Sequence, residues 1–165
     1  MTGFRCLPIP SATAKRWRAS GQDDRGNVLI RRVADGPGFP CRHCLALARP
    51  GEAMLLGSFN LERPQGVYWT PSPIFLHADA CPAFAAPNHL AETVRRNPLV
   101  SLRCYDAEGL VLYDLGLVLD GAEAEAPLRQ RLADPRTAYV NIHTARPGCL
   151  LAVAVAVAVA VAEQV

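Results

Sequence analysis

The chain has 165 residues, of which half are hydrophobic and 19% are charged. This length fits one domain with its own hydrophobic core, and this composition argues against global disorder. The net charge is only +2, which gives no reason to expect a nucleic acid or a membrane surface as a partner.

The N-terminal stretch 1–20 lacks the apolar segment that forms the centre of a signal peptide, so we expect the protein in the cytoplasm. The longest apolar run, 149–162, is shorter than the roughly 20 residues that a membrane-spanning helix needs. In a reducing compartment, the six cysteines are expected as free thiols or metal ligands before disulfides.

Short strands and three helices are predicted along the chain. In order we expect a strand at 4–9, a helix at 12–19, strands at 27–33, 41–48, 54–59 and 74–77, a helix at 89–96, a hairpin of strands 99–105 and 110–113, a helix at 123–133 and strands at 138–143 and from 149. Ser11 and Asn88 are suited to cap the first two helices. Because regular βαβ alternation is missing, this order predicts an α+β fold, a mainly antiparallel sheet with about three helices packed on one face.

Alanine and valine alternate strictly along 152–162, which suits a buried strand because successive side chains point to opposite faces. At about 3.3 Å per residue, a strand over the whole repeat would be longer than most strands. We therefore predict one α+β domain over 1–151. The tail 152–165 would supply part of a final strand, of about five or six residues, and an overhang.

A short stretch after residue 40 concentrates reactive side chains. Cys41 and Cys44 have the C-x-x-C spacing of a zinc knuckle, and His77 and Cys81 could supply two more ligands. Zinc accepts four such sulfur and nitrogen ligands in a tetrahedron. Against a zinc site, the two pairs lie further apart than in a usual zinc finger, and the knuckle lacks the glycine of its tight turn. The competing interpretation is two half-buried thiols and a loop cysteine.

The Cys41–Cys44 pair is also similar to the dithiol of thioredoxin-like oxidoreductases. Basic or polar residues between two cysteines stabilise a thiolate, as Arg42 and His43 would here. In those proteins the motif begins a helix within a βαβ unit, whereas here the chain soon reaches Pro50. The dithiol interpretation therefore lacks the setting that it requires.

A third interpretation is nucleophilic catalysis by a cysteine with a histidine base. Cys41 or Cys149 could pair with His143 or His77, because the two members of such a dyad need not be close in sequence. Among these we favour Cys41, with Arg42 lowering its pKa. The alternative is that each histidine is a surface residue or a hydrogen-bonded core residue.

Three arginines from separate segments, Arg42, Arg103 and Arg146, could converge on a small anion. Guanidinium groups bind carboxylates and phosphates through paired hydrogen bonds. The alternative is that each arginine pairs with a nearby acid on the surface. Residues 15–18 combine basic side chains with Trp17, but on a helix these point in different directions, so we expect no nucleic acid and no membrane as a partner.

Several short motifs occur in a fairly specific order. They are Pro40-Cys41-Arg42, Pro50-Gly51-Glu52, Pro73-Ile74-Phe75-Leu76-His77, Leu102-Arg103 with Tyr105-Asp106, and Tyr139-Val140 through Ala145-Arg146 to Gly148-Cys149. On these motifs the chain, from about Phe4 to Cys149, resembles the bacterial family known as domain of unknown function 1203. The resemblance implies a small bacterial single-domain protein and no activity. The family motif includes residues that match Cys41, Arg42, Arg146 and Cys149.

The sequence thus favours a small cytoplasmic binding or accessory protein, and two alternatives stay open. One is a thiol-dependent enzyme or redox protein that uses Cys41, with His143 or His77 as the base. The other is a structural zinc-binding protein that uses Cys41, Cys44, His77 and Cys81. Zinc is the cofactor that these residue types suggest, and a small anion is the ligand that the arginines suggest.

Overall fold

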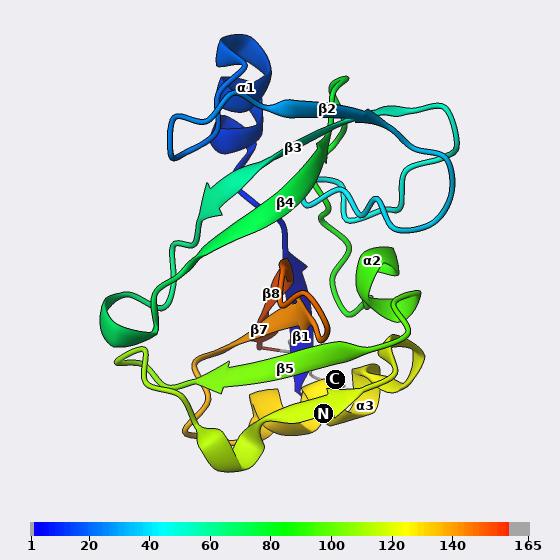
Figure 1. The fold of residues 1–165 in the computed structure, drawn as a ribbon. Helices are drawn as coiled ribbons and strands as arrows, with labels where there is room; N and C mark the ends of the chain where they lie inside the picture. Colours follow the sequence, from blue (N-terminus) through cyan, green and yellow to red (C-terminus); the bar gives the residue numbers. More distant parts are fainter. Residues whose placement is uncertain (1, 159–165) are drawn as a thin grey trace, which may run out of the picture.

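The strands of the protein divide between two antiparallel sheets in the computed structural model, which describes residues 2–158 (Figure 1). One sheet has the strand order β1-β8-β7-β5-β6, and the other has the order β2-β3-β4. The strands are β1 (Gly3–Leu7), β2 (Ile30–Val33), β3 (Ala53–Asn60), β4 (Pro71–His77), β5 (Val100–Tyr105), β6 (Leu117–Leu119), β7 (Tyr139–Thr144) and β8 (Leu150–Val157). The helices are α1 (Ser11–Ser20), α2 (Glu92–Arg95) and α3 (Glu125–Ala133), with 3-10 turns η1 (Gly66–Tyr68), η2 (Tyr113–Leu115) and η3 (Gly121–Glu123).

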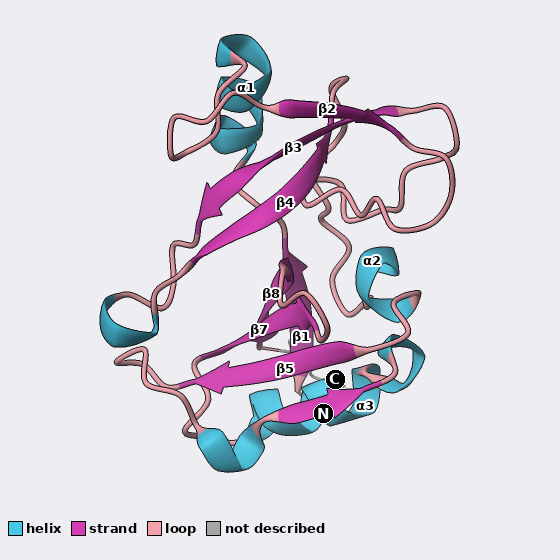
Figure 2. Cartoon of the chain, in the orientation of Figure 1, coloured by secondary structure: helices cyan, strands magenta, loops and turns pink. Residues whose placement is uncertain are grey.

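The predicted α+β class, with antiparallel strands and three helices, is confirmed (Figure 2). The strands form two sheets because β8 lies between β1 and β7, whereas β2, β3 and β4 pair among themselves. Helix α3 packs on β1, β7 and β8, and α1 packs beside the three-stranded sheet through the buried Trp17. Each sheet therefore has a hydrophobic cluster of its own.

The alanine-valine repeat enters the five-stranded sheet as β8, whose eight residues make it longer than the expected five or six. Its Ala152 and Ala154 are buried in the cluster that contains Leu128 of α3, since small side chains let the helix approach the sheet closely. Val153 packs on the other cluster. The rest of the predicted tail, 159–165, lies outside the described residues.

A bulge at the start of β8 connects the two sheets. The register against β7 shifts between Ile142 and His143, so that Leu150 is opposite His143 and Ala152 is opposite Ile142. The backbone N–H of Leu150 donates to Ser72 Oγ of β4 at 2.9 Å. A bulge leaves backbone groups unpaired in the ladder, and here one of them bonds to the other sheet.

The predicted helix 89–96 is wrong in length, because only α2 is helical. Asn88, expected to cap it, has a left-handed φ of 58° and accepts the backbone N–H of Phe4 through Oδ1 at 2.9 Å. A tertiary contact thus takes the side chain that local sequence assigns to the cap. Ser11 likewise makes no cap for α1, since Pro10 is the N-cap residue and Ser11 Oγ bonds to His43 Nε2 at 2.9 Å.

The predicted hairpin has the right first strand and the wrong second one. β5 pairs with β6 rather than with a strand at 110–113. The chain makes one bridge between Tyr105 and Val111 and then turns through η2 before β6 begins. The turn at 106–109 is as predicted, with Gly109 at φ 80°, but the strand that follows starts later.

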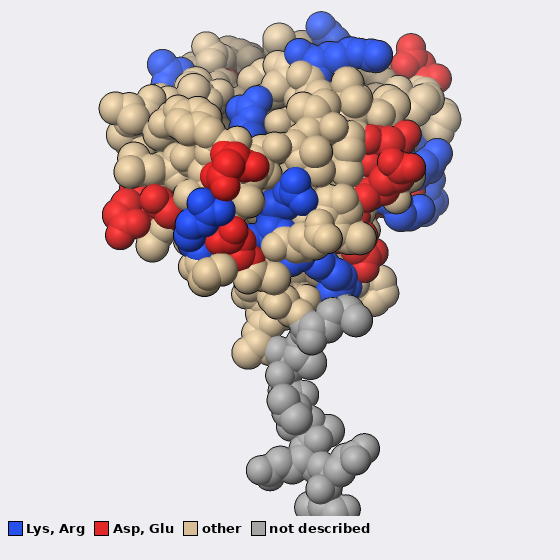
Figure 3. Space-filling model, turned by 90° about the horizontal axis from the view of Figure 1, so that it is seen from below, with Lys and Arg blue, Asp and Glu red and all other residues tan. Residues whose placement is uncertain are grey.

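On the lower side of the molecule, basic and acidic side chains are intermixed (Figure 3). The ion pairs of the described chain include Arg129 with Glu125 on α3, and Arg136 with Asp114 and Asp134. Such a surface agrees with the small net charge. None of the helices in the described part of the chain has the length and apolar character needed to span a membrane.

Candidate metal centre

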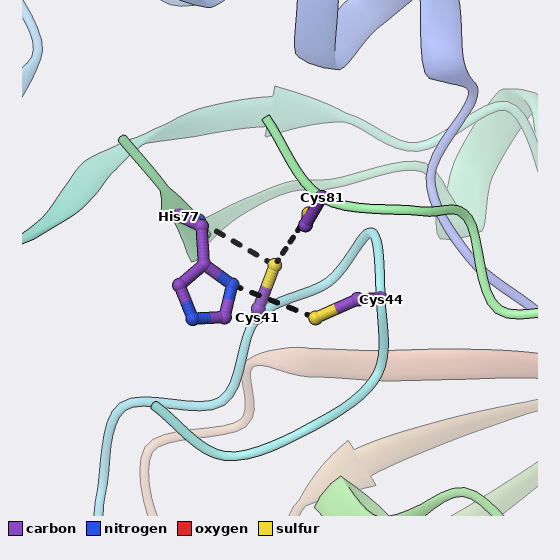
Figure 4. Close-up of side chains that lie close together, drawn as sticks. All are labelled: Cys41, Cys44, His77 and Cys81. Carbon is purple, nitrogen blue, oxygen red and sulfur yellow. Dashed lines mark hydrogen bonds between the residues drawn. The ribbon is translucent and has the colours of Figure 1, made fainter. Parts of the chain in front are cut away.

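Cys41, Cys44, His77 and Cys81 meet at one point, with their ligand atoms all within 4.8 Å of one another (Figure 4). Cys41 Sγ lies 3.8 Å from Cys81 Sγ, and Cys44 Sγ lies 3.5 Å from His77 Nδ1. Zinc bonds of about 2.3 Å to sulfur and 2.0 Å to nitrogen imply, at tetrahedral angles, sulfur–sulfur distances of about 3.8 Å and sulfur–nitrogen distances of about 3.5 Å. All six cysteines are free, so the four donors are available, and these two distances are those expected of a zinc site.

The first two residues of this cluster come from a tight turn, where a strand over 41–48 was predicted. The N–H of Leu45 bonds to the carbonyl of Cys41, and the N–H of Cys41 bonds to the carbonyl of Ala46, both at 3.0 Å. Leu45 takes a left-handed φ of 55°, a conformation that usually favours glycine. The knuckle therefore forms without glycine, because Leu45 is buried in the main hydrophobic cluster and is held there by packing.

The other two residues follow from the end of β4. His77 is its last residue, and Cys81 lies in the loop after it. A parallel bridge joins Cys41 to Phe75, and the N–H of Arg42 bonds to the carbonyl of Phe75 at 3.0 Å. The two ligand pairs are far apart in sequence, which argued against a zinc site. They still meet in the fold, because the antiparallel β3–β4 pair returns the chain to the knuckle.

A carboxylate holds the ring of His77 in place. Its Nε2 lies 3.0 Å from Glu52 Oε2, which leaves Nδ1 toward the sulfurs. Burial alone would lower the pKa of His77, but the hydrogen bond to Glu52 and the charge of Cys41 raise it overall. A ligating histidine in metal sites commonly donates its second N–H to a carboxylate in this way.

Cys81 has two basic neighbours. Arg18 Nη2 donates to its Sγ at 3.3 Å, while Arg18 Nε donates to the carbonyl of His77 at 3.1 Å. His43 Nδ1 also lies 3.3 Å from Cys81 Sγ. Because three thiolates and a divalent ion leave a net negative charge, a guanidinium beside Cys81 offsets it.

The sulfur of Cys41 is strongly favoured as a thiolate. Its pKa falls to about 4, chiefly because the Cys44 thiol donates to it, with further hydrogen bonds from the backbone N–H groups of Cys44, His77 and His43, and despite its burial. The pKa of Cys44 is raised, chiefly because its thiol donates its proton in the hydrogen bond to Cys41, and further by burial. The thiolate is the form of cysteine that binds metals and acts as a nucleophile.

Residues 38–155 match the family described as a protein of unknown function (DUF1203). The chain belongs to this family. The predicted resemblance is thus confirmed, and the matched segment contains all four residues of the cluster. No curated protein and no solved structure matches the chain.

In this DUF1203 chain, the structure does not include His143 in the cluster around Cys41. His143 is buried on β7, and its Nδ1 lies 2.9 Å from the carbonyl of Gly148. Burial, with the nearby charge of Arg103, lowers its pKa to about 4. The histidine of the cluster is His77, whose backbone N–H lies 3.4 Å from the sulfur of Cys41.

The three predicted arginines of this family member are only partly brought together. Arg42 and Arg146 line one pocket, together with Cys149. Arg103 is not part of that lining and instead lies close to Gly148. Burial lowers the pKa of Arg42 to about 10, an effect that negative charge on Cys149 and Cys41 opposes. The ion pairs found among residues 2–158 include none of the three arginines.

Sequence reasoning missed the groups that surround the four cluster residues. In the sequence, Glu52 is part of a family motif and a possible surface partner for an arginine, and Arg18 and Ser11 come from a helix far away in sequence. No spacing rule links them to the cysteines. The one available signal was the basic character of α1 next to a cysteine-rich stretch, which is too general to assign contacts.

Proposed function

We propose that this chain is a zinc-binding protein in which Cys41, Cys44, His77 and Cys81 hold one structural Zn²⁺. The observation that carries the proposal is the convergence of four ligand atoms within 4.8 Å, from two separate parts of the chain. A set of four protein ligands fills the tetrahedral coordination of zinc. A catalytic zinc keeps one position open for water or substrate, so a complete set favours a structural role.

The donor types favour zinc over other common metals. Three thiolates and one imidazole are soft ligands, whereas magnesium and calcium prefer oxygen. Tetrahedral sulfur and nitrogen sites in proteins are characteristic of zinc, with iron–sulfur centres as the main alternative. The turn 41–44 and the Glu52–His77 contact supply the knuckle and the outer hydrogen bond that such a site uses.

The surroundings of the cluster explain why a metal would be useful there. The segments 34–52 and 78–91 contain little regular secondary structure, and both pass the cluster. Coordination would hold these loops against β4 through metal–ligand bonds. The free energy of metal binding would then contribute directly to the free energy of folding. We therefore infer that zinc completes the fold of the part of the molecule built on the three-stranded sheet.

Burial argues against the thiol-enzyme alternative. Cys41 is 0% exposed, so no substrate reaches the one sulfur with a strongly lowered pKa. A thiolate that is stabilised and inaccessible suits a metal ligand better than a nucleophile. Six free thiols also fit a reducing compartment, and we propose the cytoplasm.

The direct test is the metal content of the full chain, purified without chelator and measured by inductively coupled plasma mass spectrometry. We expect one zinc per chain. The variants Cys44→Ser and Cys81→Ser should lose most of it, whereas Cys149→Ser, which changes a cysteine outside the cluster, should keep it. Well under one zinc per chain in the wild-type protein, even after refolding with added zinc, would overturn the proposal.

Cobalt provides a second readout of the ligand set. Tetrahedral Co²⁺ bound by thiolates absorbs strongly in the near ultraviolet and in the visible region, and the intensity of the sulfur charge-transfer band follows the number of thiolates. Three thiolates should be indicated in the wild type. Because Cys44→Ser binds metal weakly, it is measured in excess Co²⁺, where two thiolates should be indicated. A spectrum typical of octahedral oxygen ligands would contradict the assignment.

A further inference from the structure

A pocket of about 330 Å³ lies beside the knuckle, and none of the four cluster residues lines it. Its wall includes Arg42, Arg146 and Cys149, together with the apolar Leu56, Phe75 and Leu99. The pocket is therefore lined by the knuckle, by β3 and β4 of the three-stranded sheet, and by the turn between β7 and β8. We propose that this pocket binds a small organic anion, a carboxylate or a phosphate monoester with an apolar body, through Arg42 and Arg146.

Arg42 is a buried cation whose hydrogen bonds go to backbone carbonyl groups. The residue is 3% exposed. Its Nε donates to the carbonyl of Leu150 at 2.6 Å and its Nη1 donates to the carbonyl of Pro40 at 2.7 Å. Both acceptors are neutral, and no carboxylate of the described chain pairs with it. Negative charge on Cys149 and Cys41 favours its charged form, but neither sulfur forms a hydrogen bond with it within residues 2–158. An oxyanion in the pocket would give the buried guanidinium a charged partner in direct contact.

The two carbonyl contacts also fix the direction of the guanidinium. These contacts use the N–H of Nε and one N–H of Nη1, so the second N–H of Nη1 and both N–H groups of Nη2 are left for a ligand. No hydrogen bond from Nη2 to residues 2–158 is present. An immobilised guanidinium binds an oxyanion with little further loss of side-chain freedom. Arg42 is therefore arranged as a preformed binding group rather than as a solvated surface cation.

Arg146 supplies a second positive charge at the rim. It follows Thr144 in the turn between β7 and β8 and is exposed, with no ion pair to the described residues. Arg42 and Arg146 line the same pocket from segments that are far apart in sequence, so we infer that they contact different oxygens of one anion. Paired guanidinium groups of this kind suit carboxylate and phosphate.

The apolar wall distinguishes an organic anion from an inorganic one. Leu56 and Phe75 pair across β3 and β4, and both are only half-buried. Phe75 also stacks at a tilt on Phe39, with 5.1 Å between ring centroids. A hydrophobic surface beside a buried guanidinium is typical of a pocket for a small molecule with one charged end.

The test is calorimetric titration of the zinc-loaded full chain with benzoate, phenyl phosphate and the uncharged benzamide. Both anions should bind saturably, with benzamide at least about tenfold weaker because it cannot form a charge-assisted hydrogen bond. The stronger of the two anions assigns the ligand to the carboxylates or to the phosphates. Inorganic phosphate should bind more weakly than phenyl phosphate, since it makes no use of the apolar wall.

Two variants with the same loss of charge test the assigned residues. Arg146→Gln should weaken binding of the preferred anion by about three- to tenfold, a modest effect because Arg146 is exposed. Arg25→Gln, at an exposed turn that is not part of the pocket lining, should leave binding unchanged. Equal binding by wild type and Arg146→Gln would remove Arg146 from the site.

Cys149 provides an independent reporter of the pocket, which matters because changing Arg42 could disturb the knuckle itself. The rate of alkylation of Cys149 by iodoacetamide, followed by mass spectrometry, should fall when benzoate saturates the protein. Saturable binding that leaves this rate unchanged would place the anion elsewhere and overturn the inference, as would no binding by either anion to folded protein. Zinc content measured on the same samples keeps this result separate from the zinc proposal.

Discussion

The guanidinium of Arg42 and the carbonyl oxygen of Leu150 are joined by a 2.6 Å hydrogen bond between the knuckle and the first residue of β8. The other polar group of Leu150, its N–H, bonds to Ser72 of β4. One residue at the bulge thus connects the five-stranded sheet to both the cysteine-bearing turn and the three-stranded sheet. This link couples the candidate metal centre to the anion pocket, because Arg42 lies between them.

Removing the hydroxyl of Ser72 should weaken this link. Ser72 is 3% exposed, so Ser72→Ala leaves the N–H of Leu150 without its acceptor, which should cost about 1–3 kcal/mol in the free energy of unfolding. Urea denaturation measures this change. Ser101→Ala is the control, since its hydroxyl makes no hydrogen bond within residues 2–158, and an equal loss in both variants would contradict the role given to Ser72.

Zinc removal should destabilise the protein strongly. At a zinc concentration about a thousandfold above its dissociation constant, binding to the native state alone adds about 4 kcal/mol to the free energy of unfolding. For a chain of this length, such a loss corresponds to roughly 10 °C in Tm. Thermal unfolding with and without a chelator measures it. A Tm that is the same in both samples, at full loss of metal, would mean that the cluster has no structural role.

Changing Glu52 tests the contact that orients His77. Glu52→Gln removes the charge that faces Nε2, and we expect zinc affinity to fall by about tenfold, the lower end for such groups because the Glu52 side chain is partly exposed. Competition with a chromogenic chelator gives the affinity. Glu62→Gln, an exposed acid outside the cluster, should bind zinc as the wild type does. A wild-type affinity in Glu52→Gln would show that His77 needs no such partner.

His143 should make stability depend on pH. Its pKa is lowered from 6.5 to about 4 in the folded chain, chiefly by burial. Below pH 6.5 the unfolded chain therefore binds a proton that the folded chain does not, so stability is full above 6.5 and is lost as the pH falls toward 4. At pH 5 the loss should be on the order of 2 kcal/mol relative to pH 8.

The variant His143→Asn separates this effect from the loss of zinc at low pH. Urea denaturation at pH 8 and pH 5 should show a smaller decrease for the variant than for the wild type. Zinc release should contribute equally to both proteins, so the difference between the two decreases isolates His143. Equal decreases would show that His143 has an ordinary pKa.

A methyl group at Gly121 should not be tolerated. A Cβ there would overlap the carbonyl oxygen of Val94 and lie 2.5 Å from that of Asn97, both of which are backbone atoms. Gly121→Ala should therefore cost about 3 kcal/mol or more, because η3 and the end of α2 would have to separate. Gly36→Ala, where a Cβ meets nothing within 4 Å, should be close to neutral. Urea denaturation of both variants checks this.

Local sequence was sufficient for several parts of the structure. The spacing of Cys41 with Cys44, and of His77 with Cys81, gave the donor set, because ligand spacing within a turn or loop is a local property. The α+β class, α1, α3 and most of the strands likewise follow from runs of residues whose preferences act over a few positions.

Tertiary structure decided what local preference cannot. The strand predicted at 41–48 is a turn because Leu45 is packed into the core at a positive φ. The helix predicted at 89–96 is short because Asn88 bonds to Phe4. Both results come from contacts between residues that are far apart in the chain, and such contacts outweigh propensities of a few tenths of a kcal/mol per residue.

The same division holds for the candidate sites. The sequence determined which side chains can bind a metal or an anion, since that is fixed by their chemistry. Only the folded chain decided that His77 rather than His143 meets Cys41, that Glu52 orients His77, and that Arg42 is buried without an acid beside a pocket. Each of these depends on the pairing of β3 with β4 and of β7 with β8, which brings distant residues within bonding distance.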